Sequence, residues 1–241
     1  MTWFEGIGVF KVNNPGLSVI IPAYNEEKRI RTVLDMYARC FQAAEIIVVC
    51  DGCTDKSIAI VRDAQHQYDN IRLLTFAQKL GKGGGIIKGF REAKGNVIGF
   101  VDADNSFNPQ EIQNMVICLQ KYDACIASRR QKNSKIIRKQ PLYRQCASWV
   151  FNIFIRVIFL LPYHDTQCGA KFFRRTTLMS IIPLMKTRGF EFDVELLWRL
   201  KRNGSTAFEY PVTWGHSEGS TFSMKNIPHM FISLVRLRLT G

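Results

Sequence analysis

The stretch Asn96–Ser106, with the sequence NVIGFVDADNS, indicates the fold class of this chain. Residues 97–101 are mostly apolar, which is typical of a buried strand in a parallel sheet. The strand ends in Asp102 and Asp104, at the edge where open α/β sheets bind ligands. Two carboxylates one residue apart can hold a hard divalent cation. The alternative is a plain turn, because Asp and Asn are favoured after strands for their local hydrogen bonds.

Strand-like and helix-like segments alternate on both sides of this stretch. Apolar runs predict further strands at residues 17–21, 45–49, 71–75 and 123–128. Amphipathic helices are expected at 27–40, after Thr54 as a possible cap, after the glycine-rich run 79–85, and from Asn108 to about 121. Strands that alternate with helices of this length predict an α/β fold: a mostly parallel sheet flanked by helices, with right-handed crossovers.

Composition and charge limit the class of protein. The chain has 241 residues, of which 46% are hydrophobic, so we expect one folded domain over 1–241 rather than disorder. The net charge of +13 favours an acidic partner, either nucleic acid, anionic lipid or a phosphorylated substrate. Seven cysteines show no disulfide framework. Cys50 and Cys53 form a C-x-x-C without a second pair, so we do not expect zinc.

The second half of the chain changes character. A basic loop is expected at 129–139, and it leads to the apolar run 149–161. This run is too short to span a membrane and contains Arg156, so it predicts either a core helix or a helix lying in a membrane interface. We also expect a loop feeding a strand at 164–173, a helix at 189–200, a strand at 210–221 and a basic amphipathic end at 231–239.

Polar clusters follow four of the expected strands. They are Tyr24–Glu26, Asp51–Asp55, Lys79–Gly85 and Asp102–Asp104. Because the carboxyl ends of parallel strands meet at one sheet edge, these clusters should converge on a nucleotide-sized pocket. The first strand is not followed by G-x-G-x-x-G, and GKGGG lacks the spacing of a P-loop, so dehydrogenases and P-loop NTPases are excluded.

The assembled motifs resemble those of one family. IPAYNE (21–26), DGCTD (51–55), LGKGGG (80–85), DAD (102–104) and SRR (128–130) occur in the order found in inverting family-2 glycosyltransferases of the Rossmann-like GT-A fold. Within that family the chain is similar to polyprenyl-phosphate hexose synthases. DTQCGAKFF (165–173), FDVELL (192–197), EGS (218–220) and RLRLTG (236–241) are closer to the dolichyl-phosphate β-glucosyltransferase branch than to the mannose enzymes.

The resemblance implies a role for each matching position. The residues expected to bind the donor are Pro22, Tyr24, Glu26, Asp51, Lys82, Asp102, Ala103 and Ser220. Asp102 and Asp104 would hold Mg²⁺ or Mn²⁺. The residues expected in catalysis are Asp104, Arg129 and Asp165, with Arg129, Arg130 and Arg138 on the acceptor phosphate. Two positions depart from the mannose-type pattern: Ser106 replaces a Gln metal ligand, and His216 and Glu218 replace a more basic closing loop.

The implied reaction transfers a hexose, most simply glucose from UDP-glucose, to a dolichyl or polyprenyl phosphate with inversion. An ionised phosphate needs no strong general base, so positioning and stabilisation of the leaving diphosphate carry the catalysis. Residues 17–130 would form the nucleotide-sugar core, and 131–241 a membrane-facing acceptor part. The protein is expected on the cytoplasmic face of a membrane, peripheral, without a transmembrane helix and without nucleic acid. Alternatives are GDP-mannose or UDP-GlcNAc as donor, a soluble glycan acceptor, or a basic binding module without catalysis.

Overall fold

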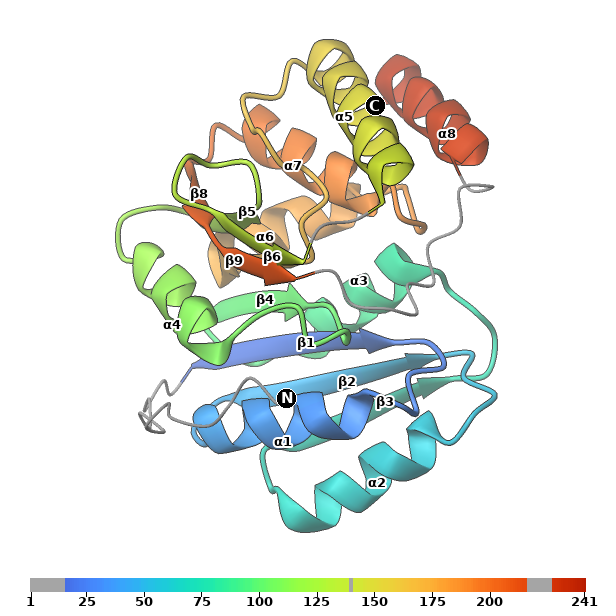
Figure 1. Cartoon of the computed structure of the whole chain (residues 1–241), viewed down its shortest axis with the longest axis vertical. Coiled ribbons are helices and arrows are strands. Elements are labelled where there is room, and N and C mark those ends of the chain that lie inside the picture. The colour runs from blue at the N-terminus through green and yellow to red at the C-terminus, as the bar shows by residue number, and fades with distance from the viewer. Residues whose placement is uncertain (1–15, 139–140, 216–226) are drawn as a thin grey trace.

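The computed structural model describes residues 16–138, 141–215 and 227–241. Its main sheet has seven strands in the order β3-β2-β1-β4-β7-β5-β8 (Figure 1). The strands are β1 (Leu17–Ala23), β2 (Glu45–Asp51), β3 (Ile71–Phe76), β4 (Val97–Val101), β5 (Ala124–Ser128), β7 (Ala170–Arg174) and β8 (Ala207–Pro211). Only β7 runs antiparallel to its neighbours in this sheet. The predicted mostly parallel sheet is therefore confirmed.

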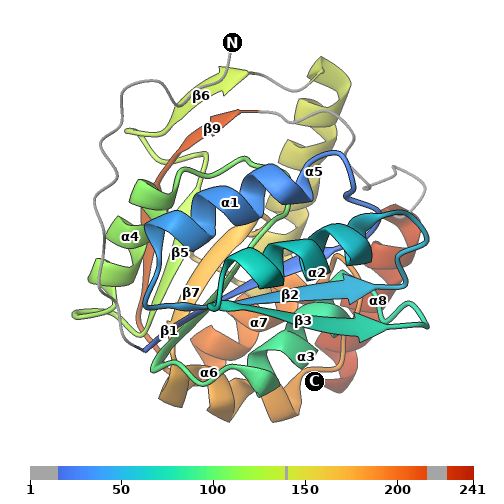
Figure 2. The same cartoon turned by 90° about the horizontal axis from the view of Figure 1, so that it is seen from below.

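Helices cover both faces of the sheet. One face carries α1 (Ile30–Cys40), α2 (Ser57–Gln67) and α4 (Pro109–Cys118), whose buried side chains share one apolar core. The other carries α3 (Lys82–Glu92), α6 (Arg175–Ile181) and α7 (Phe192–Arg202), which contribute to a second core. A short 3-10 helix, η1 (Ile182–Leu184), follows α6. Figure 2 shows α1 and α2 on one side of β1–β3 and α3 on the other.

The glycine-rich run was predicted as a loop, and that is wrong for Lys82–Gly85. These residues form the first turn of α3, and Gly81 precedes them with φ 85°. A Cβ on Gly83 would lie 2.3 Å from Cβ of Phe192, so the missing side chain lets α3 pack directly against α7. The run therefore brings the N-terminus of α3 to the edge of the sheet, where the N–H groups of Gly83 and Gly84 donate to the carbonyls of Gly189 and Arg188, at 3.2 and 2.9 Å.

Two other helix starts differ from the prediction. The first helix begins at Ile30 rather than Glu27. Thr54 does not cap α2, because Oδ1 of Asp55 accepts the Ser57 N–H at 2.9 Å. In contrast, Asn108 caps α4 as its sequence indicates, since Oδ1 of Asn108 accepts the Gln110 N–H at 2.9 Å and Pro109 opens the helix.

The basic loop expected at 129–139 contains a short strand instead. β6 (Lys135–Arg138) pairs in parallel with β9 (Thr213–Gly215) in a separate two-stranded sheet. The strand predicted at 210–221 is thus divided between β8 and β9. Ser220, His216 and Glu218 lie outside the described residues.

Two helices lie side by side at one end of the molecule (Figure 1). α5 (Leu142–Phe159) and α8 (Ile227–Thr240) meet through the rings of Phe151, Phe154 and Phe231. Within the described ranges, neither these nor any other helix is long and apolar enough to cross a membrane. Phe151 and Ile155 of α5 are buried, whereas Val157 is 66% exposed. One face of α5 therefore belongs to the core, and the other presents apolar side chains to the surface.

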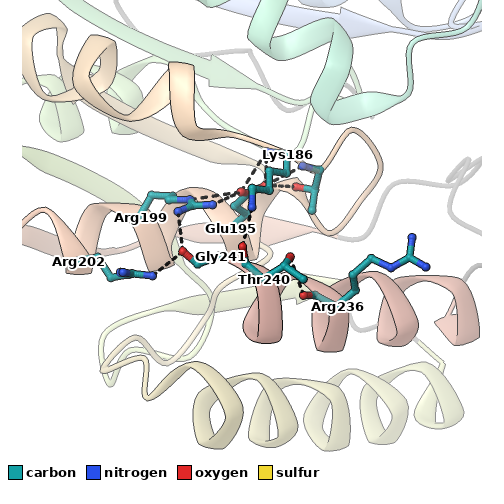
Figure 3. A network of polar contacts seen from close by, with 8 residues as sticks. Lys186, Glu195, Arg199, Arg202, Arg236, Thr240 and Gly241 are labelled. Carbon is teal, nitrogen blue, oxygen red and sulfur yellow. Dashed lines mark hydrogen bonds and ion pairs between the residues drawn. The ribbon is translucent and has the colours of Figure 1, made fainter.

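A buried carboxylate fixes the end of α8 to the body of the protein (Figure 3). Glu195 of α7 accepts hydrogen bonds from the main-chain N–H groups of Lys186 and Thr187 and pairs with Arg199 at 3.1 Å. Nζ of Lys186 donates to the Thr240 carbonyl at 2.8 Å. The position of the α5–α8 pair is thereby tied to α7.

Candidate active site

The antiparallel strand β7 decides which loops meet at the site. Ala170, the first residue of β7, lies opposite Val101, the last residue of β4. On its other side Lys171 lies opposite Ile126 of β5. The loop before β7, residues 165–169, consequently lies beside the carboxyl ends of β4 and β5. The two motifs DAD and DTQCG, which are more than 60 residues apart in sequence, come together for this reason.

Lys82 and Asp102 form an ion pair at this edge. Nζ of Lys82 lies 2.7 Å from Oδ1 of Asp102. Burial disfavours the charged amine, but Asp102 and Asp193 outweigh it and raise the pKa of Lys82 above its usual range. Lys82 therefore carries a positive charge at neutral pH, beside the carboxylate predicted to face a metal and a diphosphate.

A second ion pair, between Lys171 and Asp193, is fully buried, and the sequence did not reveal it. Nζ of Lys171 lies 2.5 Å from Oδ1 of Asp193 and donates to the Cys168 carbonyl at 2.8 Å. Both Nζ atoms, of Lys171 and Lys82, approach the ring of Phe100, at 5.4 and 5.8 Å from its centroid. Asp193 lies in the helix expected at 189–200 and was not among the residues expected in the site. The available signal was a lysine inside the apolar strand AKFF, because a buried lysine needs a carboxylate partner.

Gly169 packs directly on Asp102. The Asp102 N–H donates to the Gly169 carbonyl at 2.9 Å, and a Cβ on Gly169 would lie 2.0 Å from Oδ2 of Asp102. Only glycine leaves room for the carboxylate in its observed position. Gly169 is thus a further residue of the site that sequence reasoning missed, although the DTQCG motif contains it.

The turn after β4 positions the second carboxylate of the DAD motif, that of Asp104. Oδ1 of Asp104 accepts the Ser106 N–H at 3.1 Å, and Asn105 adopts φ 59° between them. Ala103 is buried in the apolar core, while Asp102 and Asp104 are half-buried, and the contact of Ala103 with a donor stays a prediction. The hydroxyl of Ser106 is also buried and has no hydrogen-bond partner among the described residues.

Asp102, Asp104 and Ser106 could supply some, but not all, of the oxygen ligands of a divalent cation. Among the described residues, no three His, Cys, Asp or Glu side chains gather closely enough to hold a metal ion. Asp102 and Asp104 are oxygen ligands suited to Mg²⁺ or Mn²⁺, and the unpaired Ser106 hydroxyl lies in the same turn. A cation here would need phosphate oxygens and water to complete its coordination, which suits a site that binds metal together with a diphosphate.

Arg129 and Asp165 form a buried bidentate pair. Nε and Nη2 of Arg129 donate to the two carboxylate oxygens of Asp165 at 2.7 and 2.9 Å. The Arg129 N–H adds a third bond, at 3.0 Å, and Trp214 lies 5.2 Å from the guanidinium. Burial raises the pKa of Asp165, but Arg129 outweighs it and holds the pKa at about 2. The predicted catalytic pair is thus in direct contact, with Asp165 holding Arg129.

The other two arginines expected at the acceptor phosphate differ in setting. Nη2 of Arg130 donates to the Ser148 hydroxyl of α5 at 3.2 Å, and burial lowers the pKa of Arg130. Arg138 lies on the exposed strand β6, opposite Gly215. The structure therefore places Arg130 next to Arg129, and Arg138 on a separate small sheet. Their contact with a phosphate stays a prediction.

The residues expected around the nucleotide base line the ends of β1 and β2. Nζ of Lys79 lies 3.4 Å above the ring of Tyr24, a contact that the sequence did not suggest. Glu26 pairs with Arg29 at 2.5 Å, and burial raises the pKa of Glu26. Pro22 is half-buried in β1, opposite Val49. Their contacts with a donor stay predictions.

Asp51 holds the start of α3. Its two carboxylate oxygens accept the N–H groups of Leu80 and Gly81, at 2.6 and 2.9 Å. Asp51 was expected to contact the base, and that role stays a prediction. In this structure its carboxylate fixes the glycine-rich turn that presents Lys82.

Solved structures share this fold. Glucosyl-3-phosphoglycerate synthase from Mycobacterium tuberculosis, in complex with Mg²⁺ and uridine diphosphate, superimposes with a TM-score of 0.72 at 18% identity, over 93% of this chain and 79% of that chain. The same enzyme with Mn²⁺, UDP-glucose and phosphoglyceric acid also gives 0.72 at 18% identity, over 98% and 86%. This likeness confirms the predicted GT-A fold.

Curated relatives match over most of the chain. A dolichyl-phosphate beta-glucosyltransferase of Saccharomyces cerevisiae is 29% identical over 231 residues, which cover 86% of this chain and 69% of the yeast protein. The protein of that name from Dictyostelium discoideum is 29% identical over 245 residues, covering 94% and 75%. The human one is 28% identical over 223 residues, covering 85% and 68%. Residues 18–181 match the profile of glycosyl transferase family 2, and the chain therefore belongs to this family of hexosyltransferases.

Proposed function

We propose that this glycosyltransferase moves glucose from UDP-glucose to a dolichyl or polyprenyl phosphate, with inversion at the anomeric carbon. The observation that carries the proposal is the meeting of two charged pairs at one sheet edge: Lys82 with Asp102, and Arg129 with Asp165. The first suits a nucleoside diphosphate, and the second suits the phosphate that attacks. Relatives named dolichyl-phosphate beta-glucosyltransferase support this choice of substrates.

The donor half of the reaction belongs to residues 17–130. Asp102 and Asp104 would hold Mg²⁺ or Mn²⁺, which supplies positive charge against the diphosphate as it leaves. Lys82 adds a fixed cation beside them. Lys82 is the first residue of α3, so the positive end of that helix dipole adds to the charge of its amine, while the N–H groups of Gly83 and Gly84 are held by main-chain carbonyls. Tyr24, Glu26 and Pro22 would enclose the base and ribose, and Ser220 would close over the diphosphate.

The acceptor half depends on Arg129. Two of its guanidinium nitrogens are fixed by Asp165, which leaves Nη1 and the positive charge to meet a phosphate oxygen. The phosphate is already ionised, so its oxygen can attack the anomeric carbon once it is held in line. We therefore assign Asp165 the task of orienting the acceptor through Arg129. Arg130 and Arg138 would add charge at the entrance.

A membrane surface would bring the lipid acceptor to this site. α5 and α8 carry exposed apolar side chains, among them Trp149, Val157, Leu160, Ile232 and Leu239. Beside them is a hollow of about 320 Å³ that combines apolar and basic walls, lined by Phe159, Leu160, Trp198, Lys201, Arg202 and Arg238. Apolar side chains rimmed by cations suit the interface of an anionic bilayer. We place the protein peripherally on the cytoplasmic face, where its thiols stay reduced.

The test is a transfer assay with purified protein. Radiolabelled UDP-glucose, Mg²⁺ or Mn²⁺ and a polyprenyl phosphate should give a chloroform-soluble labelled product, and Asp104→Ala should lower turnover at least about a hundredfold. UDP-GlcNAc, UDP-galactose and GDP-mannose serve as competing donors. Label that stays in the aqueous phase with a soluble glycan would favour the soluble-acceptor alternative. No lipid-linked label with any donor would exclude the proposed reaction.

A further inference from the structure

The Glu209 carboxylate of β8 joins two loops of the candidate site. Its Oε1 accepts the main-chain N–H groups of His164 and Asp165, at 2.9 and 3.1 Å. Its Oε2 accepts from Nε2 of Gln131 at 2.9 Å and lies 2.7 Å from Nδ1 of His164. Gln131 belongs to the loop after β5, and His164 and Asp165 belong to the loop before β7. One side chain thus bonds to both loops that carry the pair of Arg129 and Asp165.

The surroundings of Glu209 fill its hydrogen-bonding capacity. Its side chain is only 9% exposed, although glutamate usually lies in solvent. The two oxygens of a carboxylate accept at about four positions, and the four contacts to Gln131, His164 and Asp165 occupy them. Because a carboxylate only accepts, Nδ1 of His164 is the donor in their contact. Two of the four donors are main-chain N–H groups, so the carboxylate fixes the path of the chain at 164–165.

Asp165 connects Glu209 to Arg129. The N–H of Asp165 donates to Glu209, while its carboxylate accepts from Nε and Nη2 of Arg129 at 2.7 and 2.9 Å. The side chain of Asp165 is 2% exposed and therefore has little room to rotate. A shift of the main chain at Asp165 would consequently move or release the guanidinium group.

The segment that carries Glu209 also contacts Arg129 directly. Pro211, the last residue of β8, lies opposite Ser128, the residue before Arg129. Trp214, in the next strand β9, lies 5.2 Å from the guanidinium group of Arg129. Residues 209–214 therefore border Arg129 at its main chain and at its side chain, in addition to the contact made through Asp165.

We propose that Glu209 is a positioning residue of the transfer reaction, which acts on the acceptor phosphate through Asp165 and Arg129. Its carboxylate keeps the main chain at 164–165 where Asp165 can bind two guanidinium nitrogens at once. Without these bonds Arg129 takes other orientations, and a phosphate is held less often in line with the anomeric carbon. The effect on the phosphate rests on the proposed function, whereas the effect on Arg129 does not.

The effect on Arg129 is tested without substrate, by the rate at which its Nε–H exchanges with solvent in ¹⁵N NMR spectra. Glu209→Asp keeps the charge but withdraws the oxygens by one methylene group, so it should speed this exchange at least about tenfold. Glu209→Gln keeps an oxygen for the Asp165 N–H, and its NH₂ meets Gln131 and His164, each of which can turn an acceptor toward it. Its exchange rate should stay within about threefold of wild type.

Glu45→Asp is the matched control for shortening a partly buried glutamate. Glu45 also accepts a main-chain N–H, that of Lys94 at 2.9 Å, and the Ser18 hydroxyl at 2.6 Å. It is the first residue of β2 and so lies at the opposite, amino end of the strands. An unchanged exchange rate of Arg129 in Glu209→Asp, or an equal increase in Glu45→Asp, would overturn the proposal. A loss in Glu209→Gln as large as in Glu209→Asp would also contradict it, because the charge rather than the hydrogen bonds would then matter.

The effect on the acceptor is tested by steady-state transfer from UDP-glucose, with Mn²⁺, to a short water-soluble polyprenyl phosphate. Glu209→Asp should raise the KM for this acceptor at least about tenfold and leave the KM for UDP-glucose within about twofold. A purely structural defect would instead lower the fraction of protein that binds UDP and leave the acceptor KM of the active fraction unchanged. An acceptor KM equal to that of wild type would contradict the proposal. Wild-type protein that transfers no glucose would contradict the proposed function, and the exchange of the Arg129 Nε–H would still decide whether Glu209 positions Arg129.

Discussion

The carboxylate of Asp102 occupies the space that a side chain on Gly169 would need. A Cβ on Gly169 would lie 2.0 Å from Oδ2 and 2.5 Å from Cγ of Asp102. The strand end that carries the DAD motif and the loop that carries DTQCG are therefore complementary at this point. The same carboxylate holds Lys82 on its other oxygen, so a displacement of Asp102 would disturb both charges.

We expect Gly169→Ala to impair metal-dependent nucleotide binding far more than folding. The added methyl group meets the end of a side chain that can rotate, so we expect an unfolding free energy lower by only about 1–2 kcal/mol. The rotated Asp102 would lose Lys82 and its place at the metal, and UDP binding with Mn²⁺ should weaken at least tenfold. Calorimetric titration and urea unfolding measure the two effects. Unchanged UDP affinity would mean that Asp102 does not act from this position.

The pair formed by Asp165 and Arg129 predicts a dependence of stability on acid. The pKa of Asp165 falls to about 2 on folding. The contribution of Asp165 to the free energy of unfolding is therefore complete above pH 4 and is lost as the pH falls toward 2. Asp165→Asn removes this contribution and leaves Arg129 buried without its partner, at a cost of about 3–5 kcal/mol at pH 7. The difference in unfolding free energy between wild type and Asp165→Asn should be about 1 kcal/mol smaller at pH 3 than at pH 7.

Urea unfolding of both proteins from pH 7 to pH 3 measures this difference. Asp123→Asn is a suitable control for the pH series, since main-chain and hydroxyl hydrogen bonds from Thr206 lower the pKa of Asp123, with Arg174 adding the smallest effect. Asp123 is half-buried and has no buried cation that depends on it, so its removal should leave the stability at pH 7 less changed. A gap between wild type and Asp165→Asn that stays constant with pH would show that Arg129 does not depress the pKa of Asp165.

The sequence predicted well what depends on local pattern. Val97–Val101 was expected as a buried strand and is β4, because a strand covered on both faces has to be continuously apolar. Asn108 with Pro109 marked the start of α4 for an equally local reason, namely the unpaired N–H groups of a first turn. Convergence of the loops after β1, β2 and β4 followed from the parallel arrangement alone.

The features that the sequence did not reveal depend on the order of the strands in the sheet. β7 lies between β4 and β5 and runs against them, and nothing in AKFFR indicates that neighbourhood. This one insertion places Gly169 on Asp102 and Asp165 on Arg129. It also buries Lys171 opposite α7, where Asp193 meets it. From its motif Asp165 was expected to act in catalysis. The structure adds that its carboxylate forms an ion pair with Arg129.

The buried pair of Lys171 and Asp193 predicts strong coupling between two substitutions. Lys171→Met leaves the Asp193 carboxylate without its cation in the core and should lower the unfolding free energy by about 3–5 kcal/mol. Asp193→Leu should cost a similar amount. The double variant removes both charges and should recover most of the loss. Urea unfolding of the four proteins gives the coupling energy, and strictly additive losses would contradict the pairing. Arg31 with Asp35, a partly exposed pair on α1, should couple by less than about 1 kcal/mol.

The exposed apolar face of α5 and α8 predicts how the protein meets a bilayer. Val157 and Ile232 are each 66% exposed, so replacing both with Glu should leave the fold intact while placing two carboxylates on the surface proposed to enter the interface. The fraction that floats with anionic vesicles should fall at least tenfold, and transfer to a bilayer-bound polyprenyl phosphate should fall with it. Ile117→Glu on α4, at a position that is 50% exposed, is the matched control and should float like wild type. Equal flotation of all three proteins would show that another surface binds the membrane, because added negative charge on the true contact face must oppose insertion.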